Sequence, residues 1–288
     1  MSFPQNLHTH TVFSDGKHTL EEMVLGAIRA GCTSLGFSDH SPMPPAADPD
    51  SWSMKAEKIP AYRTEVLRLR EAYAGKLDIF LGLEQDIDSP PPEGDWDYLI
   101  GSVHGVWADG CYLSVDESAD AFDRAVREHF GGDRLAFAQA YYRQEAKAAG
   151  QTGCDIAGHF DLITKFNEGG CRFDEGDPRY RAAALEALEA LMEREVLFEI
   201  NTGAISRGCR TSPYPAPFLL EAIREKGGRV CITSDSHSAD TIVHAFPQAA
   251  ALAGSCGFRE AWVLTKNGFQ PVDLAAYRPS QGYYYFGN

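Results

Sequence analysis

A long apolar segment is the first thing that this chain lacks. No run of 18 apolar residues occurs among its 288 residues, so we expect no membrane-spanning helix. The seven cysteines are odd in number and include no C-x-x-C pair, which argues against a disulfide framework and indicates reduced thiols packed in the interior. The first residues also lack a basic and apolar leader. We therefore expect a cytoplasmic protein.

Positive charge is scarce as well. The chain has 26 Lys and Arg against 41 Asp and Glu, a net charge of -15, and no basic cluster longer than two residues. Nucleic-acid binding depends on Lys and Arg that displace counterions from phosphates, so a long nucleic acid is not expected as a partner. A small anion can still bind where bound metal ions make the site locally positive.

Short apolar runs alternate with longer helix-like segments along the chain. Six runs have the pattern of buried strands, at 34–37, 78–83, 98–103, 154–157, 196–200 and 229–233, and an extended segment around 6–11 precedes them. Helical spacing covers 20–31, which opens with a capping box at Thr19, and also 59–74, 179–195, 217–226 and 242–253. This α/β alternation predicts a single barrel domain over residues 1–288 with seven parallel strands, and the run 261–264 is a possible eighth.

Side chains of the metal-ligand type follow six of these strands. His8 and His10 lie two residues apart on an extended segment, so their side chains point to the same side. Because the carboxyl ends of parallel strands lie at one face of a barrel, we expect all these side chains to converge there. The set comprises His8, His10, His40, Glu84, His104, His159, Asp235 and His237. Taken alone, the first pair is also compatible with two solvated histidines near a chain end.

Several further residues have two interpretations. Asp39 and Asp161 flank ligand-type histidines and either orient their imidazoles or serve as ordinary loop or cap aspartates. Lys165 and Arg207 follow strand ends and either grip a phosphoryl group or lie solvated in loops. Neither cation is of a ligand type, so removal of Arg207 should leave bound metals in place. Structural or surface roles are expected for His18, His129 and His244 in helix-like segments, and packing against the barrel for the aromatic tail 283–286.

The ordered set of motifs resembles the PHP (polymerase and histidinol phosphatase) superfamily, and within it the stand-alone histidinol-phosphate phosphatases. The motifs are H-x-H-x4-D at 8–15, D-H at 39–40, G-L-E at 82–84, G-S-V-H at 101–104, G-H at 158–159 and S-D-S-H at 234–237, with Arg207 after the segment 199–202. The resemblance implies a distorted (β/α)7 barrel and a centre of three divalent metals.

The ligands of that centre are carried over residue by residue. His8, His10, Glu84 and Asp235 would hold the first metal. Glu84 would bridge to the second metal, which His104 and His159 complete, while Asp15, His40 and His237 would hold the third. Imidazoles and carboxylates suit Zn, Mn or Fe better than Mg or Ca. The family also places basic residues against the phosphate, and only Lys165 and Arg207 occupy plausible positions, the first being a Lys where an Arg is expected.

The resemblance implies an enzyme of histidine biosynthesis that hydrolyses L-histidinol phosphate, a small phosphate monoester, with water activated by the metals. Glu84, Asp15, Asp235 and Arg207 would be catalytic, and Arg207 and Lys165 would bind substrate. Two alternatives stay open. One is a phosphoesterase acting on nucleotides or short oligonucleotides, since acidity disfavours long substrates but not a mononucleotide. The other is a metal-binding module without turnover, which the number of ligand positions disfavours.

Overall fold

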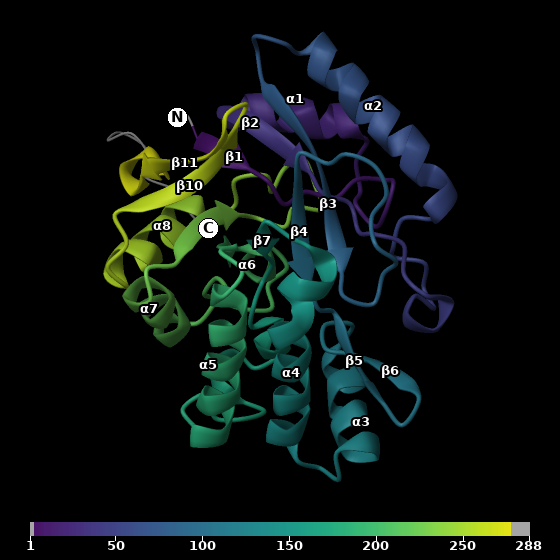
Figure 1. Ribbon diagram of the computed structural model, residues 1–288, viewed down its shortest axis with the longest axis vertical. Helices are drawn as coiled ribbons and strands as arrows, with labels where there is room; N and C mark the ends of the chain where they lie inside the picture. The colour runs from purple at the N-terminus through teal and green to yellow at the C-terminus, as the bar shows by residue number, and fades with distance from the viewer. Residues whose placement is uncertain (1–2, 278–288) are drawn as a thin grey trace.

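The computed structural model describes residues 3–277, and a seven-stranded parallel sheet forms its centre (Figure 1). The strands follow one another in chain order across the sheet, and every neighbouring pair is parallel. They are β1 (Phe3–Asn6), β2 (Cys32–Phe37), β3 (Asp78–Asp86), β4 (Tyr98–Ser102), β7 (Ile156–Ala157), β8 (Leu197–Asn201) and β9 (Arg229–Thr233). The expected α/β fold with a distorted seven-stranded barrel is confirmed.

The barrel closes just beyond the carboxyl ends of its first and last strands. The backbone N–H of His10 donates to the carbonyl of Ser236 over 2.9 Å, and the N–H of Ser236 donates to the carbonyl of His8 over 3.0 Å. Beside β1, the segment that follows the barrel is attached through the Gln5 side-chain amide. Its Nε2 lies 2.8 Å from the carbonyl oxygen of Leu264, and its Oε1 lies 2.7 Å from the Leu264 amide nitrogen. Closure therefore brings the first histidines next to the segment that carries Asp235 and His237.

The possible eighth strand exists, but it does not join the barrel. β10 (Glu260–Thr265) pairs antiparallel with β11 (Gly268–Asp273) in a separate two-stranded sheet, which Leu264 ties to β1. A second hairpin, β5 (Gly105–Ala108) with β6 (Cys111–Ser114), was not expected from the sequence. It follows His104 directly and projects beside the site.

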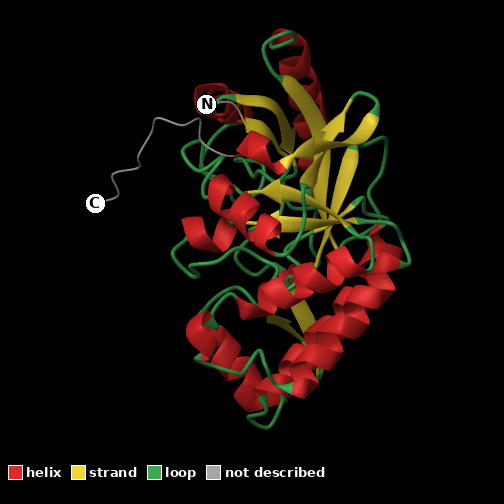
Figure 2. Cartoon of the chain, turned by 90° about the vertical axis from the view of Figure 1, so that its left-hand side faces the viewer, coloured by secondary structure: helices red, strands yellow, loops and turns green. Residues whose placement is uncertain are grey.

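Helices cover the outside of the sheet, and α3 (Ala119–His129), α4 (Arg134–Thr152) and α5 (Pro178–Met192) extend from it on one side (Figures 1 and 2). The expected helices are α1 (Leu20–Ala30), α2 (Ile59–Ala72), α5 (Pro178–Met192), α7 (Pro217–Glu225) and α8 (Phe246–Ser255), the last beginning four residues later than predicted. The Thr19 capping box is present, and α1 ends at Gly31 with φ 80°. Not predicted were α3 (Ala119–His129), α4 (Arg134–Thr152) and the short α6 (Gly203–Ser206).

Two of the three remaining histidines lie outside helices. His18 and His244 lie in turns next to α1 and α8, whereas His129 ends α3 and contacts Asp109 over 3.1 Å. The aromatic tail 283–286 lies outside the described residues. No helix within residues 3–277 is long and apolar enough to cross a membrane.

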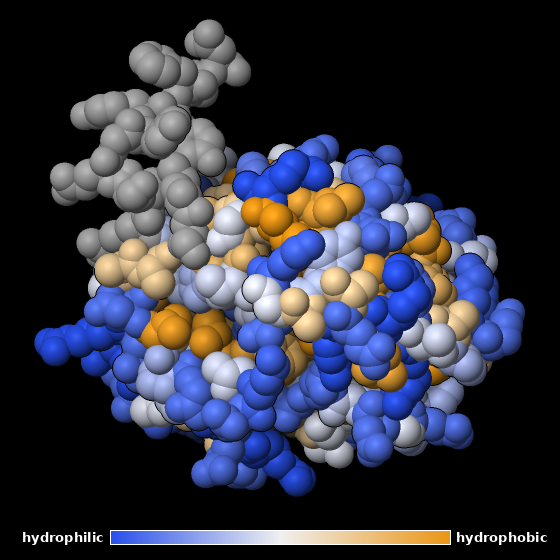
Figure 3. Space-filling model, turned by 90° about the horizontal axis from the view of Figure 1, so that it is seen from above, coloured by the Kyte–Doolittle hydropathy of each residue, from blue (hydrophilic) through white to orange (hydrophobic). Residues whose placement is uncertain are grey.

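A plug of apolar side chains fills the barrel below the candidate site. Tyr98 lies at its centre, and its hydroxyl donates to the carbonyls of Leu7 and Phe37. Gly36 and Gly82 leave the room for this ring, because a Cβ at either position would overlap it. Leu7 directly precedes His8, so the packing of these apolar side chains fixes the position of the first histidine. On the face seen in Figure 3, hydrophobic residues form patches that hydrophilic residues separate.

Candidate metal centre

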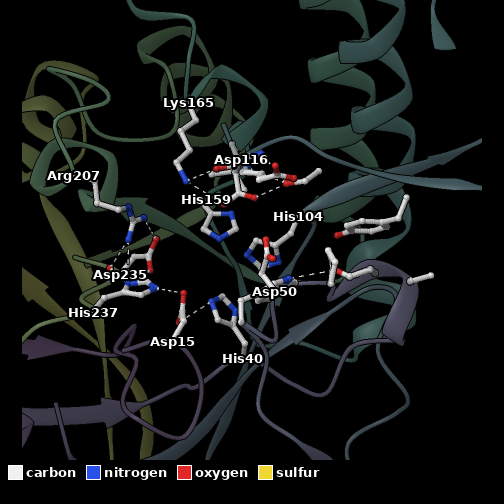
Figure 4. A pocket seen from close by; sticks show the side chains of 18 residues that line it. Asp15, His40, Asp50, His104, Asp116, His159, Lys165, Arg207, Asp235 and His237 are labelled. Carbon is white, nitrogen blue, oxygen red and sulfur yellow. Dashed lines mark hydrogen bonds and ion pairs between the residues drawn. The ribbon is translucent and has the colours of Figure 1, made fainter. Parts of the chain in front are cut away.

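The structure brings all nine expected ligand residues to the carboxyl ends of the strands. They come from the segments after β1, β2, β4, β7 and β9 and, for Glu84, from within β3: His8, His10, Asp15, His40, Glu84, His104, His159, Asp235 and His237. Their donor atoms form four overlapping groups, each with atoms within 4.8 Å of one another. Figure 4 shows six of them facing a common space.

Glu84 lies at the middle of this set. Its Oε2 is 3.3 Å from His8 Nε2, 3.5 Å from His10 Nε2 and 2.7 Å from His40 Nδ1. Its Oε1 is 3.0 Å from His159 Nε2 and 3.4 Å from His104 Nε2. The two oxygens of one carboxylate thus face different imidazoles, which is the arrangement that a bridging ligand requires.

Ser102 steadies this carboxylate from β4. Its hydroxyl donates to Glu84 Oε1 over 2.6 Å, and both side chains are buried. The serine belongs to the G-S-V-H motif, but nothing in that motif predicts its contact with Glu84.

Asp235 completes one side of the cluster. Its Oδ1 lies 3.1 Å from His10 Nε2 and 3.8 Å from His8 Nε2. The residue has φ 45°, in the left-handed region that costs a residue with a Cβ about 1–3 kcal/mol when the surroundings impose it. Such backbone strain concentrates at functional sites.

Asp15 organises the more exposed side. Its Oδ2 is 3.1 Å from His237 Nε2, and its Oδ1 is 3.6 Å from His40 Nε2 and 4.0 Å from His10 Nδ1. His40 therefore turns one ring nitrogen toward Glu84 and the other toward Asp15. His40 thus belongs to two of the four donor groups, one with Asp15 and one with Glu84.

The donor atoms are of the kind that a metal ion would satisfy. Despite the short distances given above, five donor atoms are buried without a hydrogen bond of suitable geometry in the described part of the chain: His8 Nε2, both ring nitrogens of His10, His40 Nδ1 and Glu84 Oε2. Each such atom costs about 1–3 kcal/mol when nothing pairs with it. A dense set of imidazole nitrogens and carboxylate oxygens fits transition-metal ions and would compensate these atoms together.

The protonation states suit the same role. Burial, together with His237 and His40, lowers the pKa of His10 to about 3, so this imidazole is neutral and has a lone pair free. Burial raises the pKa of the Glu84 carboxyl, but the surrounding imidazoles of His40 and His8 outweigh it and hold that pKa well below its ordinary value. His10 thus presents a neutral imidazole and Glu84 an ionised carboxylate. Burial lowers the pKa of His8, His40 and His104, but the nearby carboxylates outweigh it and raise these pKa values, so a metal ion would displace protons from those three imidazoles.

Two carboxylates behind the cluster orient its histidines. Glu199 Oε1 accepts from His8 Nδ1 over 2.6 Å, and its Oε2 accepts from the backbone N–H of His159 over 2.7 Å. Asp86 Oδ2 accepts from His104 Nδ1 over 2.8 Å. These bonds fix the Nδ1–H tautomers of His8 and His104 and leave Nε2 facing Glu84.

The orienting role expected of Asp39 and Asp161 therefore belongs to other residues. Asp39 Oδ1 accepts from the N–H groups of Thr11 and Ser14 and so anchors the loop that carries Asp15. Asp161 accepts from the N–H of Ala216, and burial raises its pKa to about 7. Within residues 3–277, no hydrogen bond joins either carboxylate to a ligand-type imidazole. The sequence analysis did not assign this orienting role to Glu199 or Asp86. Asp86 follows Glu84 by two residues in β3, so the two side chains lie on the same face of the strand.

A cavity of about 360 Å³ opens directly over the cluster, and both expected cations line it (Figure 4). Arg207 donates from Nη2 to Asp235 Oδ2 over 2.6 Å and from Nη1 to His237 Nδ1 over 3.1 Å. Lys165 Nζ lies 2.8 Å from the carbonyl oxygen of Asp116 and 3.2 Å from its carboxylate. Arg207 thus contacts two of the nine residues, a coupling to the cluster that its sequence position did not reveal.

Comparisons with known proteins identify the family of this chain. The PHP domain model matches residues 6–203. A probable histidinol-phosphatase of Deinococcus radiodurans is 33% identical over 84% of this chain and 89% of its own length. The histidinol-phosphatase of Bacillus subtilis is 26% identical over 83% of this chain and 95% of its own.

A solved structure extends the likeness to the fold. Histidinol phosphate phosphatase from Lactococcus lactis, complexed with zinc, L-histidinol and phosphate, superposes with a TM-score of 0.66 at 22% identity, over 94% of this chain and all of that one. At that identity the match speaks for the fold alone. Because the family match spans more than half of the sequence and includes the strand ends that carry most of the cluster, this chain belongs to the PHP domain family.

Proposed function

We propose that this protein is a metal-dependent phosphatase that hydrolyses L-histidinol phosphate to L-histidinol and phosphate, as a cytoplasmic step of histidine biosynthesis. The observation that carries the proposal is the nine-residue donor set around Glu84, which lies below a cavity lined by Arg207 and Lys165. The choice of substrate follows the relatives from Deinococcus radiodurans and Bacillus subtilis, which are named a probable histidinol-phosphatase and a histidinol-phosphatase. The seven free cysteines fit a reducing compartment.

The metals belong to the proposal. Three divalent ions of the Zn, Mn or Fe type would be held by the nine donor residues, with Glu84 shared between two of them and His40 facing both Glu84 and Asp15. Ions at these positions would neutralise phosphoryl charge and lower the pKa of a bound water to about 7. The zinc in the Lactococcus lactis structure supports the choice of metal type.

The chain itself contributes positioning and positive charge. The Arg207 guanidinium is held by Asp235 and His237 at the cavity wall, where its remaining N–H groups can donate to phosphoryl oxygens. The Lys165 ammonium group donates to the carbonyl and the carboxylate of Asp116. To contact a phosphate it must break one of these bonds or donate its remaining N–H. We infer that Arg207 is the main phosphoryl contact and Lys165 an auxiliary one.

The proposal is tested by assaying the metal-loaded protein with histidinol phosphate, a mononucleotide and an aryl phosphate side by side. We expect two to three divalent ions per chain, phosphate release from histidinol phosphate with the highest kcat/KM, and loss of activity after prolonged chelation. A preference for the mononucleotide would favour the phosphoesterase alternative. Metal binding without phosphate release from any of the three would favour the non-catalytic one.

A further inference from the structure

The cavity has two chemically different ends. Its floor consists of cluster residues, and the cation Arg207 lies on the wall beside them, held by Asp235 and His237; together they suit a phosphoryl group. Its opposite wall comes from the loop between β2 and α2 and from the segment after β6, and there it presents Trp52 with the carboxylates Asp50 and Glu117. If the phosphoryl group lies on the floor, the alcohol part of the ester must extend along this wall.

Trp52 is the main aromatic surface of that wall. Its ring lies 4.7 Å from the His40 ring at 90° and 5.3 Å from the His104 ring, measured between ring centroids. The indole therefore stands at the edge of the donor cluster, next to two of its imidazoles. A planar group attached to the leaving oxygen would meet this ring first.

The loop holds the indole in place without any ligand. Trp52 Nε1 donates to the carbonyl of Ala47 over 3.3 Å. The next residue, Ser53, bonds the buried carboxylate of Asp48 through both its N–H and its hydroxyl. The N–H of Met54 donates to the carbonyl of His40 over 3.1 Å. A wall that is ordered beforehand loses little entropy on binding, which favours specific recognition.

The carboxylates beside Trp52 are available for a cation. Asp116 is already paired with Lys165, whereas the carboxylates of Asp50 and Glu117 make no hydrogen bond or ion pair with residues 3–277. Asp50 is exposed and lines the same cavity as His40 and His104 (Figure 4). The wall thus combines an aromatic face with uncompensated negative charge, opposite a floor that attracts phosphate.

We propose that Trp52, flanked by Asp50 and Glu117, forms the subsite that selects the alcohol part of the substrate. The subsite takes a phosphate monoester whose alcohol carries a planar ring and a protonated nitrogen. The inference rests on the proposed phosphatase activity and adds to it the residues that distinguish one ester from another. The ring packs on the indole, and the ammonium group faces the two carboxylates.

Four esters separate the two contributions: histidinol phosphate with ring and amine, phenylethyl phosphate with the ring alone, phosphoethanolamine with the amine alone, and ethyl phosphate with neither. Trp52→Leu should raise KM about three- to tenfold for the two ring-bearing esters and leave the other two within about twofold, as expected for one lost aromatic contact. Trp52→Phe, which keeps a ring, should stay close to the wild type. Trp107→Leu removes a half-exposed tryptophan that does not line this cavity and serves as the matched control.

The carboxylates are tested with the same esters. Asp50→Asn combined with Glu117→Gln should raise KM about three- to tenfold for the amine-bearing esters, and high salt should weaken the preference of the wild type for them, because the charges are exposed. Glu57→Gln removes an exposed charge at the end of the same loop, outside the cavity, and should change nothing.

Metal content decides between this subsite and a supporting role for the indole. If Trp52→Leu loses metal, or loses activity equally toward all four esters, the ring only supports His40 and His104 and the inference is overturned. Selective loss for ring-bearing esters with full metal content supports it. If the metal-loaded wild type hydrolyses none of the four esters, the proposed phosphatase activity itself fails, which is a different result from an unchanged ester preference.

Discussion

Nη2 of Arg207 lies 2.6 Å from Oδ2 of Asp235, so a cation of the cavity wall is bonded to a carboxylate of the donor cluster. The other oxygen of Asp235 faces His10 and His8. One side chain thus links the residue expected to grip the phosphate with the residues expected to hold a metal. Substitutions on either side of this bond should be felt on both.

Replacement of Arg207 by Ala should therefore have two effects. Loss of charge-assisted bonds to the phosphoryl group should lower kcat/KM about ten- to a thousandfold for every phosphate ester alike. Loss of the bond to Asp235 should weaken metal binding about tenfold, as is usual for a partner of a metal ligand. Kinetics at limiting and at saturating metal separate the two. Full recovery at saturating metal would show that Arg207 acts through Asp235 and does not contact the phosphate.

Gly203 gives a second test of the same bond without touching either partner. A Cβ at this position would lie 2.6 Å from Arg207 Nη2 and 2.8 Å from Asp235 Oδ2. Gly203→Ala should force these atoms apart and lower kcat/KM by tenfold or more, on the order of what small misplacements cost. Gly254→Ala is the control, since nothing lies within 4 Å of its Cβ in α8. The control should retain activity and gain about 0.5–1 kcal/mol of stability. Equal activity of both variants would mean that the bond is unimportant.

The shared carboxylate is tested by Glu84→Gln. The change keeps the size of the side chain and removes the negative charge that faces five imidazoles. We expect turnover to fall almost completely and metal content to drop, because an amide bridges two ions poorly. Metal analysis by mass spectrometry and a phosphate-release assay report the two quantities. Wild-type kinetics with full metal content would show that Glu84 is not the bridge.

Most of the barrel and eight of the nine donor residues could be predicted from strand positions, because those ligand-type residues lie at or just after strand ends, whereas Asp15 lies in a loop and was assigned only through the family resemblance. The segment 105–152 was missed for two different reasons. α4 buries Phe137, Tyr141 and Tyr142 on one face, but that face also carries the charged Glu145, so the contrast between its apolar and polar faces is weak in the sequence. The hairpin β5–β6 carried a usable signal, since Asp109-Gly110 between two apolar runs is typical of a tight turn, and both residues have positive φ.

The surroundings of the cluster could not be predicted in the same way. Glu199 and Asp86 gain their roles from which ring nitrogen of His8 and His104 points inward, and this depends on the packed barrel. Trp52 lies in a loop whose path is set by hydrogen bonds that Ser53 donates to Asp48, and no periodic sequence pattern predicts these bonds. Ligands that sit at strand ends follow from topology, whereas their partners follow from side-chain geometry.

A buried glutamate away from the cluster predicts a pH effect. Glu145 in α4 is 1% exposed; burial raises its pKa well above the ordinary value, and the bond from Tyr141 only partly offsets this. The folded protein therefore binds a proton there that the unfolded chain releases near pH 4.3. This contribution to stability is fully present below pH 4.3 and is lost as pH rises toward the folded-state pKa.

Glu145→Gln mimics the protonated form and should remove that loss. The difference in unfolding free energy between the variant and the wild type should therefore increase in favour of the variant by about 1 kcal/mol or more from pH 5 to pH 8, since each unit of pKa shift corresponds to about 1.4 kcal/mol. Urea unfolding of the metal-loaded proteins at both pH values measures the change. Its activity should stay near the wild type, which makes it a buried-glutamate control for Glu84→Gln. A stability difference independent of pH would mean that Glu145 is ionised in the folded protein.

A substitution of Glu199 distinguishes a residue that orients metal ligands from a residue that is itself a ligand. Glu199→Gln keeps the size of the side chain but replaces one accepting oxygen by an NH2 group, which must then face a donor at His8 Nδ1 or at the N–H of His159. We expect metal affinity to fall about 10- to 100-fold, the usual effect of losing an orienting carboxylate behind a metal-bound histidine. Excess metal should restore most of the activity, because the nine donors remain, whereas Glu84→Gln should not recover. Glu189→Gln removes an exposed partner of Lys226 and is the matched surface control. Unchanged metal affinity in Glu199→Gln would show that His8 and His159 keep their orientation without this carboxylate.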